Sequence, residues 1–392
     1  EDITMTACIV GWSHSRFGKL DGVSLEALIT DVAAAAVADA GLEPQDIDAI
    51  YLGTFNAGMD PQDFAASLVL QTDSRFRFTP STRVENACAT GSAAIHQGLN
   101  AIAAKQARFV LAVGVEKMTG IDTAAVGNCL LKASYVAEEA GQPGGFAGVF
   151  GRIAQSYFQR FGDQSDALAR IAAKNHRNGA VNPLAHMQKD FGYDFCRQVS
   201  DKNPLVAGPL KRTDCSMVSD GAAAVVLTDV GTALSMRKAI AFRSRAQVND
   251  YLPMSKRDIL AFEAPARAWA QALEGARLTL DDLSLVETHD CFTIAELLEY
   301  EAMGLTPKGQ GARAINEGWT EKDGRLPINP SGGLKAKGHP IGATGVSMHV
   351  MAAMQLSGTA DKMQIPNARL AGVFNMGGAA VANFVSILEP LR

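Results

Sequence analysis

Residues 288–292 read Thr-His-Asp-Cys-Phe and place an imidazole, a carboxylate and a thiol side by side after a short apolar run. These groups serve in general acid–base catalysis, in nucleophilic catalysis and in metal binding. The stretch alone fits a catalytic loop, a metal site or three polar residues at the end of a strand. The choice depends on where the chain places its other cysteines and histidines.

Cys88 follows a strand-like segment and precedes the small residues that open a predicted helix. A thiol at the N-terminus of a helix lies near unpaired backbone N–H groups and the positive end of the helix dipole. We therefore expect a lowered pKa for Cys88, and the same N–H groups could hold an oxyanion. A buried cysteine without a role is the competing interpretation, which spacing alone does not exclude.

His339 lies in the segment NPSGGLKAKGHPIGATG, residues 329–345, which is rich in glycine and contains two prolines. A histidine in such an irregular, fixed loop could deprotonate a thiol or donate to an oxyanion. The loop precedes a predicted helix, but it lacks the Gly-Lys-Ser/Thr and Gly-x-Gly-x-x-Gly patterns of phosphate-binding loops. The sequence therefore favours acid–base chemistry here.

The elements that position these residues are predicted to occur twice along the chain. An alanine-rich helix leads into a strand-like run in Ala27–Phe55 and again in Ala264–Phe292. A glycine turn opens an apolar helix both at Cys88 and at Gly342. Matching strands follow in both copies: Phe109–Glu116 with Leu370–Gly378, and Asp220–Asp229 with Gly377–Leu388. Alternating helix and strand patterns indicate layered α/β structure.

The segment between the two copies has no counterpart, and part of it has amphipathic helical spacing. Long insertions on a scaffold are often functional, whereas a disordered linker is the competing interpretation. The predicted domains are an N-terminal half, an inserted loop domain and a C-terminal half. Their predicted ranges are 1–118 plus 210–232, 119–209 and 233–392, respectively.

The 392 residues are 47% hydrophobic and 20% charged, which indicates a globular chain. A net charge of −5 gives no general attraction to nucleic acid, so any anionic ligand needs a local basic patch. The six cysteines include no Cys-x-x-Cys pair, so reduced thiols are expected and a structural zinc site is not. The sequence shows neither a signal peptide nor a run of about 18 apolar residues, and we expect a cytoplasmic protein without a membrane span.

Three blocks carry a family resemblance: VENACATGSAA around Cys88, HDCF at 289–292, and NPSGGLKAKGHPIGATG. They resemble the signature blocks of thiolases, and HDCF in place of the commoner Asn-Glu-Ala-Phe resembles the sterol-carrier-protein type. The resemblance covers essentially the whole chain. It implies the thiolase fold, with two duplicated α/β halves in five αβαβα layers and a central loop domain over the coenzyme A (CoA) site.

Within this resemblance, Cys88 matches the nucleophile that carries the acyl group as a thioester, and His339 matches the residue that activates it. The backbone N–H groups of Cys88 and Gly377 match the oxyanion hole for the acyl thioester. His289 and His339 would together bind the thioester oxygen of the second substrate, whose enolate needs stabilisation. Asp290 has no role in this assignment.

One position departs from the usual thiolase pattern, because Asn375 stands where a second catalytic cysteine is common. Cys291 is then the natural base, since a thiol near two histidines can exchange a proton near neutral pH. A buried spectator thiol is the alternative. A zinc site built from Cys291, His289, His339 and Cys88 is chemically possible, but we expect no metal and no tightly bound cofactor.

The resemblance also suggests contacts to CoA. A serine matches one that contacts pantetheine, several basic residues are candidates for the nucleotide phosphates, and a phenylalanine falls near the position that lines the acyl pocket. The candidates are Ser216, Lys211, Arg212, Lys174, Arg177 and Phe150. For each basic residue alone, a solvated charged face is an equally good interpretation.

The resemblance implies an acyl-CoA C-acyltransferase that interconverts 3-ketoacyl-CoA plus CoA with acyl-CoA plus acetyl-CoA through an acyl-cysteine. A related thioester-dependent carbon–carbon lyase or ketosynthase, and a thiolase-like subunit of an acyl-transfer complex, are the alternatives. The family implies a homodimer or homotetramer and, in complexes, a small OB-fold zinc-binding partner protein. Nucleic acid is not an expected partner.

Overall fold

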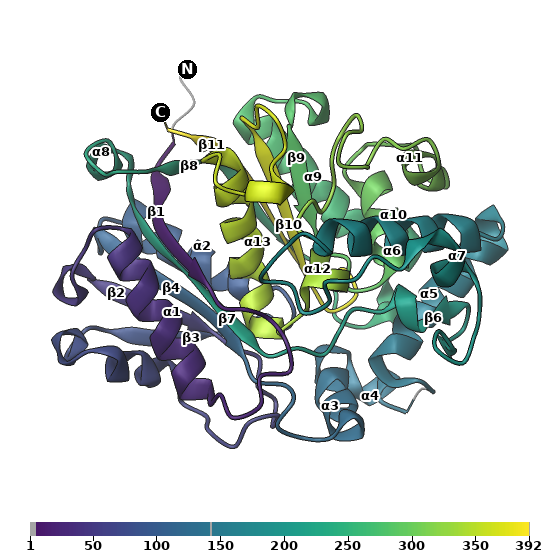
Figure 1. Ribbon diagram of the computed structural model, residues 1–392, viewed down its shortest axis with the longest axis horizontal. Coiled ribbons are helices and arrows are strands. Elements are labelled where there is room, and N and C mark those ends of the chain that lie inside the picture. Colours follow the sequence, from purple (N-terminus) through teal and green to yellow (C-terminus); the bar gives the residue numbers. More distant parts are fainter. Residues whose placement is uncertain (1–4, 142, 392) are drawn as a thin grey trace.

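Nine strands form one mixed sheet in the computed structural model, which describes residues 5–141 and 143–391 (Figure 1). Their order across the sheet is β3-β2-β4-β7-β1-β8-β11-β10-β9. The strands are β1 (Ala7–His14), β2 (Ala49–Gly53), β3 (Ser81–Val84), β4 (Phe109–Glu116), β7 (Gly221–Asp229), β8 (Ile240–Asn249), β9 (Leu285–Thr288), β10 (Ala371–Gly377) and β11 (Ala382–Pro390). A separate ribbon pairs β5 (Leu205–Ala207) with β6 (Leu210–Lys211).

The strand pairing confirms the predicted duplication. In the first half β2 runs parallel to β4, β4 runs antiparallel to β7, and β7 pairs antiparallel with β1. The second half repeats this arrangement, with β9 parallel to β10 and β11 antiparallel to both β10 and β8. The pairs Cys8–Ala241 and Ile9–Ile240 join β1 to β8 and make the two halves one sheet.

Helices form three layers around the two halves of the sheet (Figure 1). α1 (Leu25–Asp39) packs on the strands of the first half, and α9 (Glu263–Ala276) packs on β8 and β11 of the second. α2 (Thr90–Ala103) and α13 (Ile341–Leu356) contact one another, and α13 also contacts strands of both halves. The five predicted αβαβα layers are present, although the two β layers belong to one continuous sheet.

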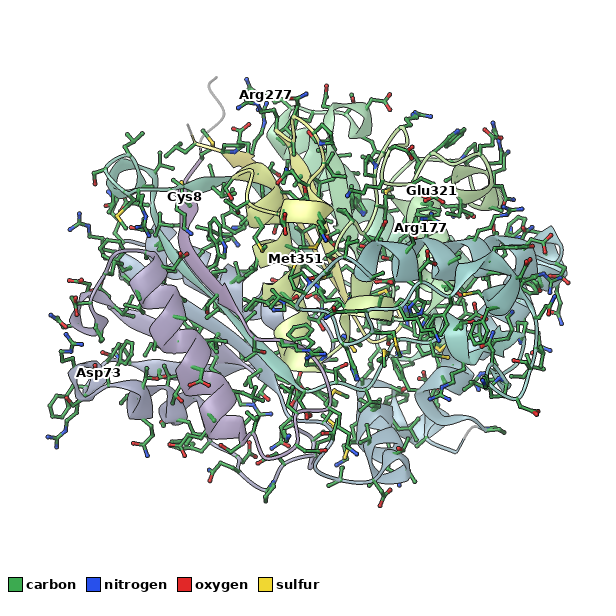
Figure 2. All side chains as sticks on the ribbon, viewed as in Figure 1. Cys8, Asp73, Arg177, Arg277, Glu321 and Met351 are labelled. Carbon is green, nitrogen blue, oxygen red and sulfur yellow. The ribbon has the colours of Figure 1, made fainter. Side chains whose placement is uncertain are left out.

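The central position of α13 follows from its sequence. This helix is apolar on all its faces and nearly all its residues are buried, which is typical of a helix enclosed by other elements. Met351 on α13 and Cys8 on β1 both lie in this interior (Figure 2). None of the helices within the described residues is long and apolar enough to cross a membrane.

The two central helices touch backbone to backbone near their N-terminal ends. A Cβ added to Gly91 of α2 would lie 2.5 Å from the Val346 nitrogen and 2.8 Å from the Gly345 Cα. A Cβ added to Gly345 would in turn overlap the Ser92 nitrogen. Only glycine permits this approach, which brings together the two loops that precede α2 and α13.

Gly345→Ala is expected to lower the free energy of unfolding by roughly 1–3 kcal/mol, because the new methyl group must push the α2 and α13 backbones apart. Denaturant unfolding measures the loss. Gly120→Ala is the matched control, since a Cβ there meets no atom within 4 Å and its φ is not positive. Equal stability of the Gly345 variant and the unchanged protein would show that the helices separate without cost.

The inserted segment adds helices that pack on the second half of the chain. α6 (Ser165–Gly179) contacts α10 (Thr293–Ala302) and α12 (Gly333–Lys337). The predicted domain boundaries stay a prediction.

The remaining helices are α3 (Thr123–Leu130), α4 (Val136–Glu139), α5 (Gly145–Phe161), α7 (Gly192–Arg197), α8 (Val230–Ala233) and α11 (Ala312–Asn316). Short 3₁₀ helices are η1 (Pro44–Asp46), η2 (Ala65–Thr72), η3 (Ser74–Phe76), η4 (Leu131–Ala133), η5 (Arg212–Asp214), η6 (Met254–Lys256), η7 (Ile259–Ala261), η8 (Leu280–Asp282) and η9 (Asp361–Met363).

Candidate active site

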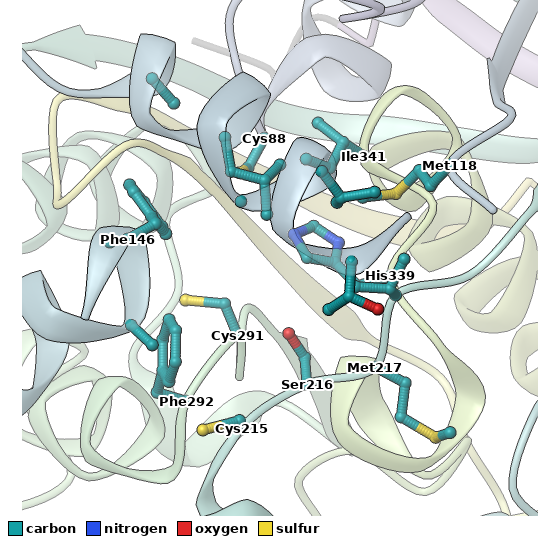
Figure 3. Close-up of a pocket in the computed structure, with 18 of the residues that line it drawn as sticks. Cys88, Met118, Phe146, Cys215, Ser216, Met217, Cys291, Phe292, His339 and Ile341 are labelled. Atoms are coloured by element: carbon teal, nitrogen blue, oxygen red, sulfur yellow. The ribbon is translucent and has the colours of Figure 1, made fainter. Parts of the chain in front are cut away.

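A cavity of about 310 Å³ lies where the loops before α2 and α13, the loop after β9 and the inserted segment meet (Figure 3). Cys88, Cys291 and His339 line this catalytic cavity together, and Ser216 lies on its wall. The other lining side chains are mainly apolar, among them Met118, Val126, Leu130, Phe146, Phe292 and Ile341. Residues far apart in the sequence therefore meet in one apolar chamber.

A strained turn positions Cys88. Ala87 has a φ of 50°, in the left-handed region that an alanine occupies only at a cost of about 1 kcal/mol or more. Thr90 Oγ1 closes the turn by accepting a hydrogen bond from the Asn86 nitrogen at 2.8 Å. α2 begins at Thr90, so Cys88 lies at the N-terminal end of a helix, as the sequence predicts.

Asn375 determines the tautomer of His289. Its Nδ2 donates to the Cys88 carbonyl oxygen at 3.0 Å, and because a carbonyl can only accept, this amide atom must be the nitrogen. The same Nδ2 lies 3.0 Å from His289 Nδ1, which therefore accepts. The proton of a neutral His289 is then on Nε2, which is buried and has no partner within the described residues.

His339 has the opposite tautomer. The Thr344 hydroxyl donates to the Pro340 carbonyl oxygen at 3.1 Å, so it accepts from His339 Nδ1 at 2.6 Å. His339 Nε2 then carries a lone pair, and it too is buried without a partner in the described part of the chain. Burial lowers the pKa of His339 to about 3 and that of His289 well below its usual value. Both rings are therefore neutral. His289 Nε2 is a hydrogen-bond donor, and His339 Nε2 is an acceptor.

The two imidazoles and the Cys88 thiol form a compact group. The ring centroids of His289 and His339 are 5.2 Å apart, and one nitrogen of each ring lies within 4.8 Å of the other and of Cys88 Sγ. This spacing could hold a metal ion such as zinc, which binds thiolates and imidazoles. It equally suits transfer of a proton from a thiol to an imidazole. The three side chains can therefore act on a single reacting group.

Burial keeps the thiols of Cys88 and Cys291 protonated. It raises the pKa of Cys88 to about 12, although a hydrogen bond from the Gly378 N–H to the sulfur acts in the opposite direction. Burial also raises the pKa of Cys291 well above its usual value, and the neighbouring Cys88 and Glu299 add to this effect. The predicted lowering of the Cys88 pKa is therefore wrong, because desolvation outweighs the N–H groups. The N–H that donates to the sulfur belongs to Gly378, and the oxyanion role of the neighbouring Gly377 stays a prediction.

Two family models match the chain. The thiolase N-terminal domain matches residues 7–191, and the thiolase C-terminal domain-like model matches residues 246–390. An acetyl-CoA acetyltransferase of Methanothermobacter thermautotrophicus is 37% identical over 383 residues, which cover 97% of this chain and 98% of that protein. The chain belongs to the thiolase family.

Other known proteins share sequence or fold with this chain. Sterol carrier protein 2 of Oryctolagus cuniculus is 33% identical over 337 residues, which cover 79% of this chain and 59% of that protein. The Ltp2-ChsH2(DUF35) aldolase superposes with a TM-score of 0.84 at 22% identity, covering 100% of both chains. Human mitochondrial 3-ketoacyl-CoA thiolase in complex with CoA gives a TM-score of 0.75 at 16% identity, covering 99% of this chain and 98% of that one. The two structures show that the thiolase fold is shared.

Asp290, which the sequence left without a role, anchors the glycine-rich loop of this thiolase-family protein. Its carboxylate accepts hydrogen bonds from the Leu334 nitrogen at 2.6 Å and the Lys335 nitrogen at 3.2 Å, at the start of α12. The loop that carries Cys291 is thereby fixed to the helix that leads into His339. Asp290 is a positioning residue for both.

Asp290→Ala is expected to lower the free energy of unfolding by about 2–4 kcal/mol, because two buried backbone N–H groups and the Asn175 amide lose an acceptor. Turnover should fall as well, since Cys291 and His339 lose their common anchor. Asp290→Asn keeps one acceptor oxygen and should recover part of both losses. Denaturant unfolding and steady-state rates test this, and identical behaviour of the two variants would contradict an anchoring role.

A second cavity, of about 520 Å³, adjoins the catalytic cavity, and residues 215–218 line both. We call it the basic cavity. Its lining includes Arg212, a predicted CoA contact, and it also includes four residues that sequence reasoning missed: His176, Lys189, Lys202 and Lys335. Among the described residues that line it there is no aspartate or glutamate. Two of the lysines occur in loops whose charge is visible in the sequence, but their convergence is not.

Three predicted phosphate contacts, Lys174, Lys211 and Arg177, line neither cavity, and their charges are paired with carboxylates. Lys174 is fully buried, and its Nζ lies 2.6 Å from a buried glutamate carboxylate. Lys211 is 3% exposed, with its Nζ 3.6 Å from Asp214 Oδ2. Arg177 pairs with Glu321 on the surface and lines neither cavity (Figure 2).

The last two predicted contacts lie beside the catalytic cavity. Ser216 lines it, and its backbone N–H donates to the Cys291 carbonyl oxygen at 2.9 Å. Phe150 is fully buried behind Phe292 and stacks on it, with ring centroids 4.5 Å apart. Phe292 and not Phe150 lines the cavity, so Phe150 supports the wall from behind.

Proposed function

We propose that the protein is an acyl-CoA C-acyltransferase that interconverts 3-ketoacyl-CoA plus CoA with acyl-CoA plus acetyl-CoA. One observation carries the proposal: Cys88, Cys291 and His339 line one apolar chamber, and a ring nitrogen of His289, which has the opposite tautomer, lies within 4.8 Å of Cys88 Sγ and of a His339 nitrogen. Carbon–carbon bond exchange between thioesters needs a covalent acyl carrier, a proton carrier for the α-carbon and donors for developing oxyanions. The 37% identity to an acetyl-CoA acetyltransferase supports the same reaction.

In the cleavage direction, Cys88 attacks the 3-keto carbon of the substrate. The thiol proton moves to His339 Nε2 as the sulfur–carbon bond forms, and the keto oxygen takes the negative charge. The N–H groups of Cys88 and Gly378, both at the sulfur, are candidates to bind that oxygen. When the intermediate collapses, the Cα–Cβ bond breaks, Cys88 keeps the acyl group as a thioester, and the electron pair passes to the α-carbon.

The product of this cleavage is the enolate of acetyl-CoA, whose α-carbon takes the proton of Cys291. His289 Nε2–H and the protonated His339 Nε2 bind the enolate oxygen. After acetyl-CoA leaves, free CoA gives its thiol proton to the Cys291 thiolate and attacks the acyl group. Cys88 departs and recovers its proton from His339, so every group returns to its starting state.

We place CoA across both cavities. Ser216 and its neighbours in the shared wall would contact pantetheine, while Lys189, Lys202 and Arg212, all exposed, would face the nucleotide phosphates. The human thiolase of the same fold is itself a complex with CoA, which supports this placement. The apolar catalytic cavity would hold the acyl chain. No tightly bound cofactor is part of the proposal.

We propose a homodimer or homotetramer that acts in the cytoplasm in lipid metabolism, on the basis of the family resemblance. A small OB-fold zinc-binding partner is a further proposal, supported by the fold shared with the Ltp2-ChsH2(DUF35) aldolase. Light scattering on the purified chain measures its oligomeric state. Co-purification of a partner that raises a feeble activity would favour a subunit of an acyl-transfer complex.

The test of the proposed function is thiolysis. The protein is mixed with acetoacetyl-CoA and CoA, and the loss of the absorbance of the 3-keto thioester is followed, then repeated with 3-ketoacyl-CoA of increasing chain length. Turnover that depends on both substrates supports the proposal. Absence of turnover at every length would refute it. Condensation that requires malonyl-CoA instead of acetyl-CoA would favour the ketosynthase alternative.

A further inference from the structure

Two buried side chains of the basic cavity have polar atoms without partners. Lys335 is 3% exposed, and no hydrogen bond or ion pair with a described residue reaches its ammonium group. His176 is 2% exposed, and neither of its ring nitrogens has a partner within the described chain. Thr213 Oγ1 in the same lining is also buried, and the Cys196 thiol is its one neighbouring polar group among the described residues. We call Lys335, His176 and Thr213 the polar floor.

The acidic groups nearest to Lys335 are committed to other partners. Asp290 binds the start of α12 through its carboxylate. Asp214 accepts from the Lys211 nitrogen and from Thr293 Oγ1, both at 2.7 Å. Burial lowers the pKa of Lys335; Asp214 and Asp290 act in the opposite direction, but no carboxylate of the described residues pairs with its ammonium group within 4 Å. A buried ammonium group without a paired carboxylate indicates that its partner is a bound anion.

The remaining lining of the basic cavity fits an anion with several acceptor oxygens. Lys189, Lys202 and Arg212 add three exposed cations to the buried one, and no described lining residue is acidic. Burial lowers the pKa of His176 to about 2, so its ring is neutral and donates one N–H without adding charge. Phosphate groups accept several charge-assisted hydrogen bonds at once, which this mixture of ammonium, imidazole and hydroxyl donors can supply.

We propose that the polar floor is an anion site that binds a phosphate group. The phosphate group could belong to CoA, or it could be free phosphate or a small phosphate ester. In the first case the inference rests on the proposed function. The site has a direct route to the catalytic cysteine. The lining of the same cavity contains Ser216, whose backbone N–H donates to the Cys291 carbonyl oxygen, and the Lys335 backbone nitrogen donates to Asp290. An occupied floor therefore stabilises the loop that carries Cys291.

The experiment is calorimetric titration of the full chain with inorganic phosphate, CoA and pantetheine. Lys335→Met removes the buried charge, and Lys308→Met, at an exposed lysine outside both cavities, is the matched control. The unchanged protein and the control should bind phosphate, and Lys335→Met should weaken this binding at least about tenfold. Pantetheine, which carries no phosphate, should bind all three proteins within about twofold of one another.

The competition between ligands identifies the source of the phosphate. If phosphate competes with CoA and Lys335→Met weakens both, the floor takes a phosphate of CoA. If phosphate binds alongside CoA and only phosphate is weakened, the floor takes a separate ligand. Binding of phosphate and CoA that is unchanged in Lys335→Met would overturn the proposal. Because no turnover is measured, failure of the thiolase reaction and failure of the anion site give different results.

Thermal unfolding separates a ligand role for Lys335 from a structural one. A lysine that supports the fold would lower the melting temperature when replaced, whereas removal of an unpaired buried charge leaves it unchanged or raises it. Phosphate should raise the melting temperature of the unchanged protein more than that of Lys335→Met. His176→Asn, which keeps a neutral donor at a nearby position, should retain part of the phosphate binding. A Lys335→Met protein with a lowered melting temperature would contradict the inference.

Discussion

Cys88→Ala is expected to reduce the kcat of acetoacetyl-CoA thiolysis by at least about 10⁴-fold, because it removes the only atom proposed to carry the acyl group. CoA binding, measured by calorimetry, should remain within about threefold, since the basic cavity does not include Cys88. No acyl-protein should form with acetyl-CoA, which mass spectrometry detects. Cys8→Ala, at a buried cysteine on β1, is the control and should keep its activity. A Cys88→Ala protein that still forms an acyl-enzyme would place the nucleophile elsewhere.

The raised pKa of Cys88 gives this nucleophile a distinctive pH dependence. A thiol with a pKa of about 12 is protonated at neutral pH, so its thiolate fraction rises about tenfold for each pH unit. Alkylation of Cys88 by iodoacetamide should therefore accelerate steadily between about pH 6 and pH 9 without a plateau. A plateau near neutral pH would show a preformed thiolate–imidazolium pair. The absence of a plateau would mean that His339 takes the proton only as the sulfur attacks.

The fold was predictable because it depends on patterns that repeat along the chain. Alternation of helix and strand signals fixes the α/β class, and two similar orders of elements indicate two similar halves. The close approach of Gly91 and Gly345 then follows from glycine turns that open α2 and α13. This crossing puts the loops of Cys88 and His339 side by side, which explains why two motifs far apart in sequence could be assigned to one site.

What the sequence could not supply depends on burial and on contacts across the fold. The helix end at Cys88 is visible in the sequence, but the desolvation that raises its pKa is not. Lys174 and Lys335 look alike as charged residues, yet one is paired with a glutamate and the other faces a cavity. The role of Asp290 also needs the structure, because the partners of its carboxylate lie 44 or more residues away in the sequence, in both directions.

In the proposed mechanism, Asn375 replaces the usual second cysteine and Cys291 takes over the proton transfer. Asn375 cannot carry a proton between carbon and solvent, but its amide holds the Cys88 carbonyl and the His289 ring. It therefore keeps His289 as a donor to the enolate oxygen, and leaves the proton transfer to another group. Among the described residues, the titratable side chains that line the catalytic cavity are Cys88, His339, Cys215 and Cys291.

Cys291→Ala is consequently expected to lower thiolysis and condensation by about 10²–10⁴-fold, the usual contribution of a positioned acid or base. Acylation of Cys88 by acetyl-CoA should become slower but persist, because His339 still takes the Cys88 proton and the CoA thiolate can leave without the proton that Cys291 would give it. Exchange of the α-protons of acetyl-CoA in heavy water should be lost, which NMR measures directly. Cys129→Ala, at a buried cysteine that does not line the cavity, should leave all three properties unchanged. A variant that acylates normally and also exchanges α-protons at the full rate would show that the base lies elsewhere, and His339 would be the next group to test.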